Sequence, residues 1–472
     1  MEDIKRTIRR ILNVLVSNIA LIASSVVVSF IIPNILTIED YGYYRTFSLY
    51  LTYAGIFSFG LTEGIVLKYG GSDYNELVRE DFRTYFKWLL VINLFFSVTL
   101  SFISSLFINN EYRFIFYALS INIFALNISS HFQQISQITL RVKEYSFRRI
   151  LQAILNVAIV MFLLFSANVL KNEVNYKMYI VLLVAMNIVL ALWYIYTYRD
   201  ISFGKSHKMF ELKKDVFDLC KNGLPLLFAN LSSAFFMILD RQFINIAYPN
   251  KTYAIYSFAY SMLSLITVAT SAVHTIMYPT IKRVNYDSLK GTYKIASETV
   301  LLLLTLMLFS YFPLVVIVNT FIPKYTDSLS IFRIIMPCIV VSSTITVTMR
   351  SYYKALNESS RYFRLSIVAI VASFLLDLVC FFTIKTIESL SISSLFVVIA
   401  WYILCEDYLV KLFSLNRWKN LCYIILCFVA FFVASSLKNL IFGALLFLLV
   451  YLCLTYILYR EDIRKMWVLY KK

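Results

Sequence analysis

Charged residues are scarce in this chain, and their scarcity argues against a soluble protein. Only 15% of the 472 residues are charged, whereas 60% are hydrophobic and the mean hydropathy is +0.74. A soluble globular domain carries roughly 25% charged residues. Apolar runs of about 20 residues, long enough to cross a hydrocarbon layer of roughly 30 Å as a helix, recur along the sequence. The sequence therefore predicts an all-α integral membrane protein that crosses the bilayer many times.

Motifs of several enzyme and metal-binding classes are also missing. The seven cysteines form no CxxC pair and no spacing typical of a metal site. No HExxH, DxD or glycine-rich nucleotide-binding loop occurs. We therefore expect no catalytic residues, no resident metal and no cofactor.

We predict fourteen membrane-spanning helices. The N-terminal apolar segment is about 25 residues long, which exceeds the roughly 7–15 of a cleaved signal peptide, so we take it as the first span. The expected spans are 12–33, 44–67, 87–108, 114–138, 150–168, 178–198, 222–247, 254–280, 296–318, 328–349, 365–385, 391–410, 420–437 and 440–459.

The positive charges are distributed unevenly between the loops. The net charge of +17 comes from Lys and Arg residues that gather in every second loop, as the positive-inside rule requires for the cytoplasmic side. This pattern predicts that both termini are cytoplasmic. It also explains the basic character of the chain without a nucleic-acid partner, and we expect none.

An internal repeat links the two halves of the chain. Tyr41, Gly42 and Tyr44 align at a constant offset with Tyr253, Ala254 and Tyr256, and six predicted helices separate the copies. An even number of helices gives a parallel repeat, which is typical of transporters whose halves surround a site near the membrane midplane. We expect two six-helix bundles, residues 1–200 and 201–414, followed by two further helices in 415–472.

Polar residues form stripes along several predicted spans. In the eighth span the stripe contains Tyr260, Ser264, Thr267, Ser271, His274 and Tyr278, spaced three or four residues apart. Such spacing places them on one helix face. Two interpretations remain: the stripe lines a water-filled cavity, or its residues hydrogen-bond to neighbouring helices. Asn230 belongs to a similar face of the seventh span.

Two charges interrupt the seventh span, where Asp240 and Arg241 stand in the apolar stretch FFMILDRQFINI. A charge at the bilayer centre costs roughly 2.5–3.5 kcal/mol on insertion scales, so each needs a partner, water or a ligand. We predict either structural pairing or a functional role, in which Arg241 gives a cavity positive potential and Asp240 orients it or takes part in ion coupling. Asp377 is the other mid-span acid, with the same two interpretations. Pro225 is expected to bend this span as a hinge or a static kink.

Two segments resemble a known family. EDYGYYRTFSLYLTYAGIFSFGL resembles the start of the second helix of Wzx-type polysaccharide (O-antigen) flippases, of the MOP exporter superfamily. LDRQFINIAYPNKTYAIYSFAYSM resembles their seventh helix and the start of the eighth, although the glycines of that motif are absent.

The resemblance implies a fold and a substrate. The fold would be MATE-like, with two bundles in a V around a cationic cavity. The substrate would be an undecaprenyl-pyrophosphate-linked oligosaccharide, an O-antigen or capsular repeat unit, moved from the cytoplasmic to the outer leaflet of the bacterial inner membrane by alternating access. Partners would be membrane lipids and the polymerase and chain-length proteins of a polysaccharide pathway.

The resemblance also suggests a set of site residues. It places Arg45 and Arg241, in the two motif regions, in the substrate cavity, and Lys68, Arg141 and Arg350 at its cytoplasmic mouth. The polar stripes and the charges within the spans add Asn230, Asp240, Tyr260, Thr267, Ser271 and His274 to the candidate cavity residues. Coupling to an H⁺ or Na⁺ gradient would involve Asp240, Asp377 and Glu63.

Three alternatives remain open. A MATE-like drug or cation antiporter would place acidic rather than basic residues deep in its cavity. A membrane polysaccharide polymerase or ligase would carry a large periplasmic loop, and all the predicted outer loops are short. The third alternative is a membrane scaffold that transports nothing, against which the polar stripes argue.

Overall fold

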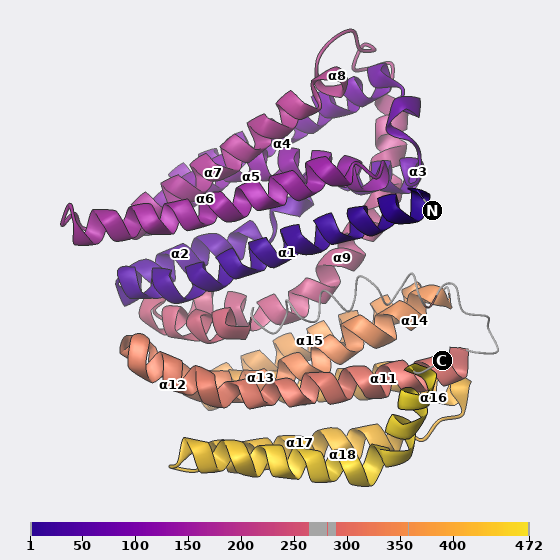
Figure 1. Cartoon of the computed structure of the whole chain (residues 1–472). Coiled ribbons are helices and arrows are strands. Elements are labelled where there is room, and N and C mark those ends of the chain that lie inside the picture. Colours follow the sequence, from indigo (N-terminus) through magenta and orange to yellow (C-terminus); the bar gives the residue numbers. More distant parts are fainter. Residues whose placement is uncertain (1, 264–280, 282–288, 357, 471–472) are drawn as a thin grey trace. The chain divides into compact units, whose positions relative to one another are not determined.

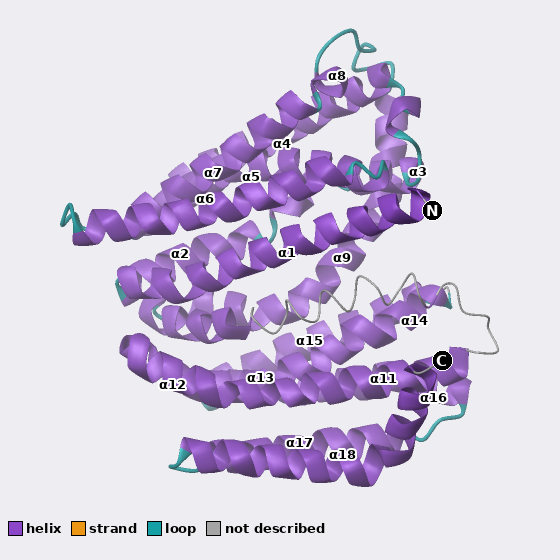
Figure 2. Ribbon diagram, viewed as in Figure 1, coloured by secondary structure: helices purple, strands orange, loops and turns teal. Residues whose placement is uncertain are grey.

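The computed structural model describes residues 2–263, 281, 289–356 and 358–470, and helices make up almost all of this part of the chain, with no strand (Figures 1 and 2). Two compact units divide between Leu231 and Ser232, inside one long helix. We call residues up to Leu231 the first unit and residues from Ser232 onward the second unit. The prediction of bundles bounded at 200 and 414 stays a prediction.

The first unit is built from long antiparallel helices joined by short turns. Its elements are α1 (Glu2–Ile35), α2 (Ile38–Leu51), η1 (Ala54–Ser58), α3 (Leu61–Tyr69), η2 (Tyr74–Glu76), α4 (Arg79–Phe107), α5 (Asn110–Ile138), α6 (Val142–Asn168), α7 (Tyr176–Thr197), α8 (Arg199–Ser202) and the beginning of α9 (Lys213–Ala247). Helix α1 packs along α6, and α5 packs against both α4 and α7 (Figure 1).

The second unit continues from α9 through a helical segment at residues 250–263. Its other elements are α11 (Leu289–Leu306), η4 (Met307–Ser310), α12 (Tyr311–Phe321), η5 (Pro323–Tyr325), α13 (Ser328–Thr344), η6 (Ile345–Met349), α14 (Arg350–Ala355), α15 (Ser359–Thr383), α16 (Ile387–Phe413), α17 (Arg417–Ser435) and α18 (Leu440–Tyr470). Helix α16 packs against both α13 and α15, and α17 pairs with α18.

Eleven helices among the described residues are long and apolar enough to span a membrane, or twelve when a bent pair counts as one span. These twelve coincide with twelve of the fourteen predicted spans. The other two predicted spans are 222–247, which α9 covers as a helix outside this set, and 254–280, which runs into residues outside the description. The chain is therefore a multi-pass membrane protein, and the count of fourteen stays a prediction.

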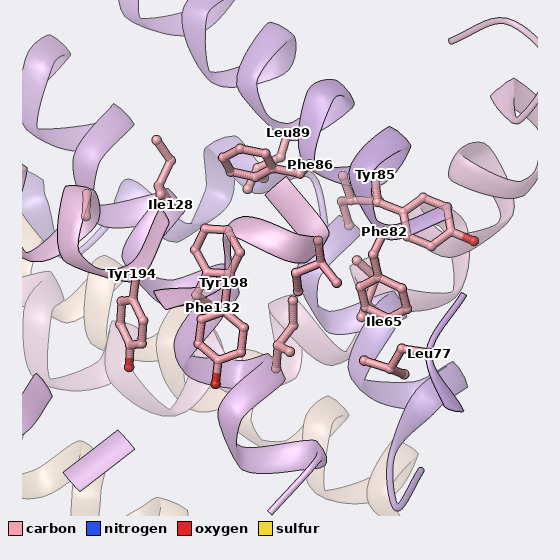
Figure 3. Packing of buried hydrophobic residues seen from close by; sticks show 14 of the residues in the cluster. Ile65, Leu77, Phe82, Tyr85, Phe86, Leu89, Ile128, Phe132, Tyr194 and Tyr198 are labelled. Carbon is pink, nitrogen blue, oxygen red and sulfur yellow. The ribbon is translucent and has the colours of Figure 1, made fainter. Parts of the chain in front are cut away.

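Helix α4 buries one face and exposes the other, as a helix next to lipid does. On α4 the buried side chains include Phe82, Tyr85, Phe86 and Leu89, at the i, i+3, i+4 and i+7 positions of one helix face. They pack with Phe132 of α5 and with Tyr194 and Tyr198 in and after α7 (Figure 3), where Phe132 stacks on Tyr198 with ring centroids 5.4 Å apart. The outward residues of α4 are apolar and exposed, including Val91, Leu94, Phe95 and Val98. This exposure suits acyl chains rather than water.

The predicted span 44–67 is broken in the structure. The bent pair Ile38–Ser58 and Leu61–Tyr69 turns by 58°. Phe59 and Gly60 both adopt left-handed backbone conformations at the break, with φ of 51° and 74°. Glycine accepts this conformation without steric cost, so the segment predicted as span 44–67 consists of two helical parts that bend at this point.

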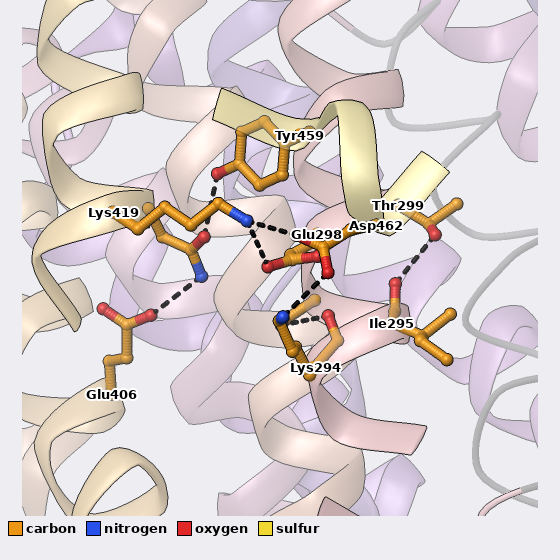
Figure 4. A network of polar contacts seen from close by, with 10 residues as sticks. Lys294, Ile295, Glu298, Thr299, Glu406, Lys419, Tyr459 and Asp462 are labelled. Carbon is orange, nitrogen blue, oxygen red and sulfur yellow. Dashed lines mark hydrogen bonds and ion pairs between the residues drawn. The ribbon is translucent and has the colours of Figure 1, made fainter. Parts of the chain in front are cut away.

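A buried polar network joins α11, α16, α17 and α18 in the second unit (Figure 4). The Lys419 ammonium contacts Glu298 at 3.0 Å and Asp462 at 2.5 Å, while Lys294 contacts Asp462 at 2.7 Å. The network continues from Tyr459, which donates to Asn420 at 2.8 Å. These contacts hold the last two helices on the bundle.

We expect Asp462→Asn to lower the thermal stability of the purified protein. Burial opposes ionisation of Asp462, but hydrogen bonds from Lys294 and Lys419 outweigh it and hold its pKa below the usual value. A depressed pKa contributes stability above the unfolded value of about 3.9 and loses it as the pH falls through the folded value. The lost contacts amount to roughly 1.5–3 kcal/mol at neutral pH. Melting curves at pH 7 and at successively lower pH check this, because the difference between the two proteins should narrow only below about pH 4 and vanish below the folded pKa of Asp462.

Candidate functional site

The structure brings two of the three predicted ion-coupling acids together in the second unit. Asp240 of α9 is 1% exposed and Asp377 of α15 is 0% exposed. Adjacent serines of α16 bind them: Ser394 donates to Asp240 Oδ2 at 2.5 Å, and Ser393 donates to Asp377 Oδ1 at 2.7 Å. The two carboxyl groups also interact with each other. We call Asp240 and Asp377 the acid pair.

Two tyrosines complete the surroundings of the acid pair. The hydroxyls of Tyr260 and Tyr256 donate to Asp240 Oδ2 at 3.1 and 3.4 Å. The guanidinium of Arg241 lies over the ring of Tyr260, 5.1 Å from its centroid. Tyr260, predicted as a cavity residue, therefore contacts both of the charged groups that interrupt this span.

One carboxylate oxygen of each residue of the acid pair lacks a hydrogen-bond donor among the described residues. Asp240 Oδ1 and Asp377 Oδ2 are buried and take no hydrogen bond from any residue that the structure describes. The side chains that donate to the other two oxygens are neutral hydroxyls. Two adjacent carboxylates in such surroundings repel each other unless they share a proton or a small cation. The arrangement therefore favours a shared positive charge at the acid pair, and Arg241 supplies one positive charge that acts on Asp240.

Sequence reasoning missed three residues of this site, namely Tyr256, Ser393 and Ser394. A signal was present, because the first two turns of α16 contain the serine-rich stretch SLSISS. The serines at Ser393 and Ser394 point to two different carboxylates because neighbouring residues on a helix face directions about 100° apart.

Glu63 belongs to a different place from the acid pair. It lies in α3 of the first unit, only 8% exposed, with Ser58 and Gln134 as neighbours that interact with its carboxyl group. Its proposed part in ion coupling stays a prediction.

Two of the basic residues predicted at a cytoplasmic mouth have partners in the first unit. Lys68 forms an ion pair with Asp215 at 2.7 Å, and Tyr85 donates to the same carboxylate. Burial opposes the ionisation of Asp215, but these hydrogen bonds outweigh it and hold its pKa below the usual range. Arg141 pairs with Glu144 at 2.6 Å.

The other predicted residues are distributed over both units. Arg45 of α2 lies with its guanidinium 5.8 Å from the ring centroid of Tyr41. Arg350 is the first residue of α14, and its positive charge acts by repulsion on the ammonium group of Lys354. Thr267, Ser271 and His274 lie outside the described residues, as does the side chain of Asn230. The substrate cavity to which these residues were assigned stays a prediction.

Comparison with known proteins gives both a family and a fold. A protein-family model described as "Polysaccharide biosynthesis protein" matches residues 9–285, which is more than half of the chain. A search of curated proteins finds no match.

Among solved structures, the lipid II flippase MurJ in an inward closed conformation matches with a TM-score of 0.66. The match covers 97% of this chain and 100% of MurJ at 13% sequence identity. An inward-facing multidrug resistance MATE family transporter of the MOP superfamily matches with a TM-score of 0.55 and 16% identity, over 84% of this chain and 95% of its own. An outward-facing MATE family transporter matches with a TM-score of 0.56 and 14% sequence identity, over 86% of this chain and 95% of its own.

These likenesses confirm the predicted MATE/MOP-like helical fold. The family match agrees with the sequence resemblance to polysaccharide flippases. Because the family model matches residues 9–285, more than half of the chain, the chain belongs to the family of polysaccharide biosynthesis proteins.

Proposed function

We propose that this protein moves a lipid-linked oligosaccharide, such as an O-antigen or capsular repeat unit on undecaprenyl pyrophosphate, from the cytoplasmic to the outer leaflet of a bacterial inner membrane. Both termini are then cytoplasmic. The observation that carries the proposal is the combination of a polysaccharide biosynthesis family with a fold that extends over the whole length of a lipid II flippase.

The physical chemistry of the substrate supports the proposal. A sugar–diphosphate head group cannot enter hydrocarbon without losing its hydration, so it needs polar surfaces and positive charge along its path. The chain has 35 tyrosines, whose amphipathic rings suit sugar faces, and basic residues such as Arg45 and Arg241 within its apolar helices.

The acid pair supplies a means of coupling. Uptake of a proton or a sodium ion at Asp240 and Asp377 changes the charge of a site whose tyrosine also contacts Arg241. Binding that favours one conformation of the protein shifts the equilibrium between inward and outward states by its differential affinity. The proposal therefore includes alternating access coupled to an H⁺ or Na⁺ gradient, with no cofactor.

Deletion of the gene tests this function in the cell of origin. We expect loss of the surface polysaccharide and accumulation of the lipid-linked repeat unit with its sugar in the cytoplasmic leaflet. Accessibility of the sugar to a membrane-impermeant oxidant, compared in inverted vesicles and intact spheroplasts, reports its side. A deletion strain with normal surface polysaccharide would rule the proposed function out.

Arg241→Ala should reduce export by roughly 10–100-fold, because a charge-assisted contact to a phosphate is worth about 1.5–3 kcal/mol. Arg361→Ala is a matched control, since Arg361 also lies over a tyrosine, 4.1 Å from the Tyr408 centroid. Surface polysaccharide and membrane protein level are measured together. Normal export in Arg241→Ala, or an equal loss in Arg361→Ala, removes Arg241 from the mechanism.

A second candidate function is the export of drugs or organic cations. The acid pair favours this function, because buried carboxylates attract cations. The presence of MATE transporters among the similar structures also favours it. Drug resistance on overexpression, set against loss of surface polysaccharide on deletion, separates the two functions.

A further inference from the structure

A cavity of about 480 Å³ lies in the first unit, separate from the acid pair of the second unit. It is lined by Tyr74, Asn75, Arg79, Arg141, Thr197, Arg199 and Asp200. These residues come from η2, the start of α4, the turn before α6, and the segment from α7 to α8. All of these segments belong to the face that the distribution of Lys and Arg assigns to the cytoplasm. We call it the arginine cavity.

Aromatic rings and a carboxylate hold Arg141 in place. Its guanidinium lies 4.2 Å from the ring centroid of Tyr74 and 4.7 Å from that of Tyr198. Glu144 accepts from its Nε at 2.9 Å and from its Nη2 at 2.6 Å. No described residue accepts from Nη1, so this part of the planar guanidinium is already oriented and still able to donate.

The one carboxylate in the lining is already satisfied. Asp200 accepts from the Tyr74 hydroxyl at 2.8 Å and faces Arg79 Nε at 3.7 Å. Its main-chain oxygen accepts from Arg83 at 2.9 Å. Asp200 therefore helps to form the wall of the cavity, and its single negative charge does not neutralise the arginines of the lining.

Positive charge exceeds negative charge in the lining. Three arginines stand against one aspartate. Arg199 is exposed, its guanidinium lies 5.6 Å from the Tyr196 ring centroid, and it forms no ion pair within the described part of the chain. Even with Glu144 counted against Arg141, the cavity keeps a net positive charge.

From this geometry we propose that the arginine cavity binds a phosphate group, carried either by the head of an acidic phospholipid or by a free phosphate compound. The planar guanidinium donates two parallel hydrogen bonds that match phosphate oxygens. The volume of about 480 Å³ admits a phosphate together with a small polar group. The position at the ends of membrane helices places the site where the anionic head groups of the cytoplasmic leaflet gather. This site does not depend on the proposed export function.

Titration calorimetry on the purified full-length chain in a neutral detergent tests the proposal. One arm uses dihexanoyl phosphatidylglycerol with dihexanoyl phosphatidylcholine as its uncharged counterpart, and the other arm uses inorganic pyrophosphate. The variants are Arg199→Gln and Arg79→Gln, which change exposed side chains. The control is Arg364→Gln, an exposed arginine at the start of α15 outside the cavity.

Saturable binding in at least one arm, weakened about tenfold or more by each cavity variant and unchanged by the control, supports the proposal. The arm that binds assigns the source: phosphatidylglycerol alone indicates a lipid head group, pyrophosphate alone indicates a free compound, and both indicate recognition of the phosphate itself. Absence of binding in both arms overturns the proposal. So does binding that the cavity variants leave unchanged or that the control weakens equally.

Discussion

Asp377→Asn and Asp240→Asn are each expected to reduce export roughly 5–150-fold. This range corresponds to typical coupling free energies of about 1–3 kcal/mol. The side chain of asparagine is nearly the same size as that of aspartate, so packing is preserved. It cannot take up a proton and carries no charge to hold a cation. Surface polysaccharide in cells and translocation in vesicles with an imposed H⁺ or Na⁺ gradient are the measurements.

The same substitutions should leave the apparent Tm unchanged or raise it. Asp240 and Asp377 are both fully buried next to each other, and removing one of two neighbouring carboxylates removes a repulsion. A structural role predicts the opposite, since asparagine replaces one buried acceptor oxygen of the carboxylate with an NH2 donor that the site is not built to receive. Asp327→Asn is the control, because Asp327 is an exposed aspartate of the same unit. A large fall in Tm together with lost export would argue for a structural role.

Salt and pH separate the two coupling ions. If sodium occupies the acid pair, the Tm of the unaltered protein rises with sodium concentration at constant ionic strength. At a sodium concentration one hundred times Kd, binding adds about 2.7 kcal/mol to the free energy of unfolding. Potassium should not reproduce the effect, and Asp377→Asn should abolish it. If a proton occupies the site, sodium has no specific effect and gradient-driven transport follows pH alone.

The sequence predicted the acid pair residue by residue but not as a pair. Asp240 and Asp377 were visible because a charge within an apolar run is costly and therefore rarely present without a function. Their contact depends on how α9 packs with α15 and α16, which are far apart along the chain. Serines in a membrane helix often hydrogen-bond to their own backbone, so Ser393 and Ser394 carried little signal alone.

Spans were predictable from apolar length, whereas their internal geometry was not. The break in span 44–67 depends on a left-handed Phe59 followed by a left-handed Gly60, and phenylalanine gives no sequence signal for that conformation. Arg141 was expected at the mouth of a cavity, and its contacts with the rings of Tyr74 and Tyr198 and with Glu144 could not be predicted. Long-range contacts of this kind have no signature in residue spacing.

The second large effect concerns the packing of α9 on α3 in the first unit. A Cβ atom on Gly223 would lie 1.9 Å from the Gly60 carbonyl oxygen and 2.5 Å from the Gly64 nitrogen. A Cβ atom on Gly64 would lie 2.1 Å from the Leu219 carbonyl oxygen. These neighbours are backbone atoms, so they move only if a helix moves. Pro225, the residue at which a bend was predicted, lies two positions after this close contact. Helix α9 continues through Pro225 as one helix, and the bend stays a prediction.

Gly223→Ala should lower the stability of the purified protein by about 1–3 kcal/mol or more, the usual cost of overpacking, and Gly223→Val should lower it further. Gly291→Ala is the matched control, because Gly291 lies in α11 with no atom within 4 Å of an added Cβ. Alanine is a better helix former than glycine by roughly 0.8–1.0 kcal/mol, so this control should be stabilised. Thermal melts of the three variants in one detergent give the comparison. Because the steric conflict is with main-chain atoms, no rotamer change in a neighbouring side chain can relieve it. An unchanged melting temperature in Gly223→Ala would mean that α9 does not touch α3 in the folded protein.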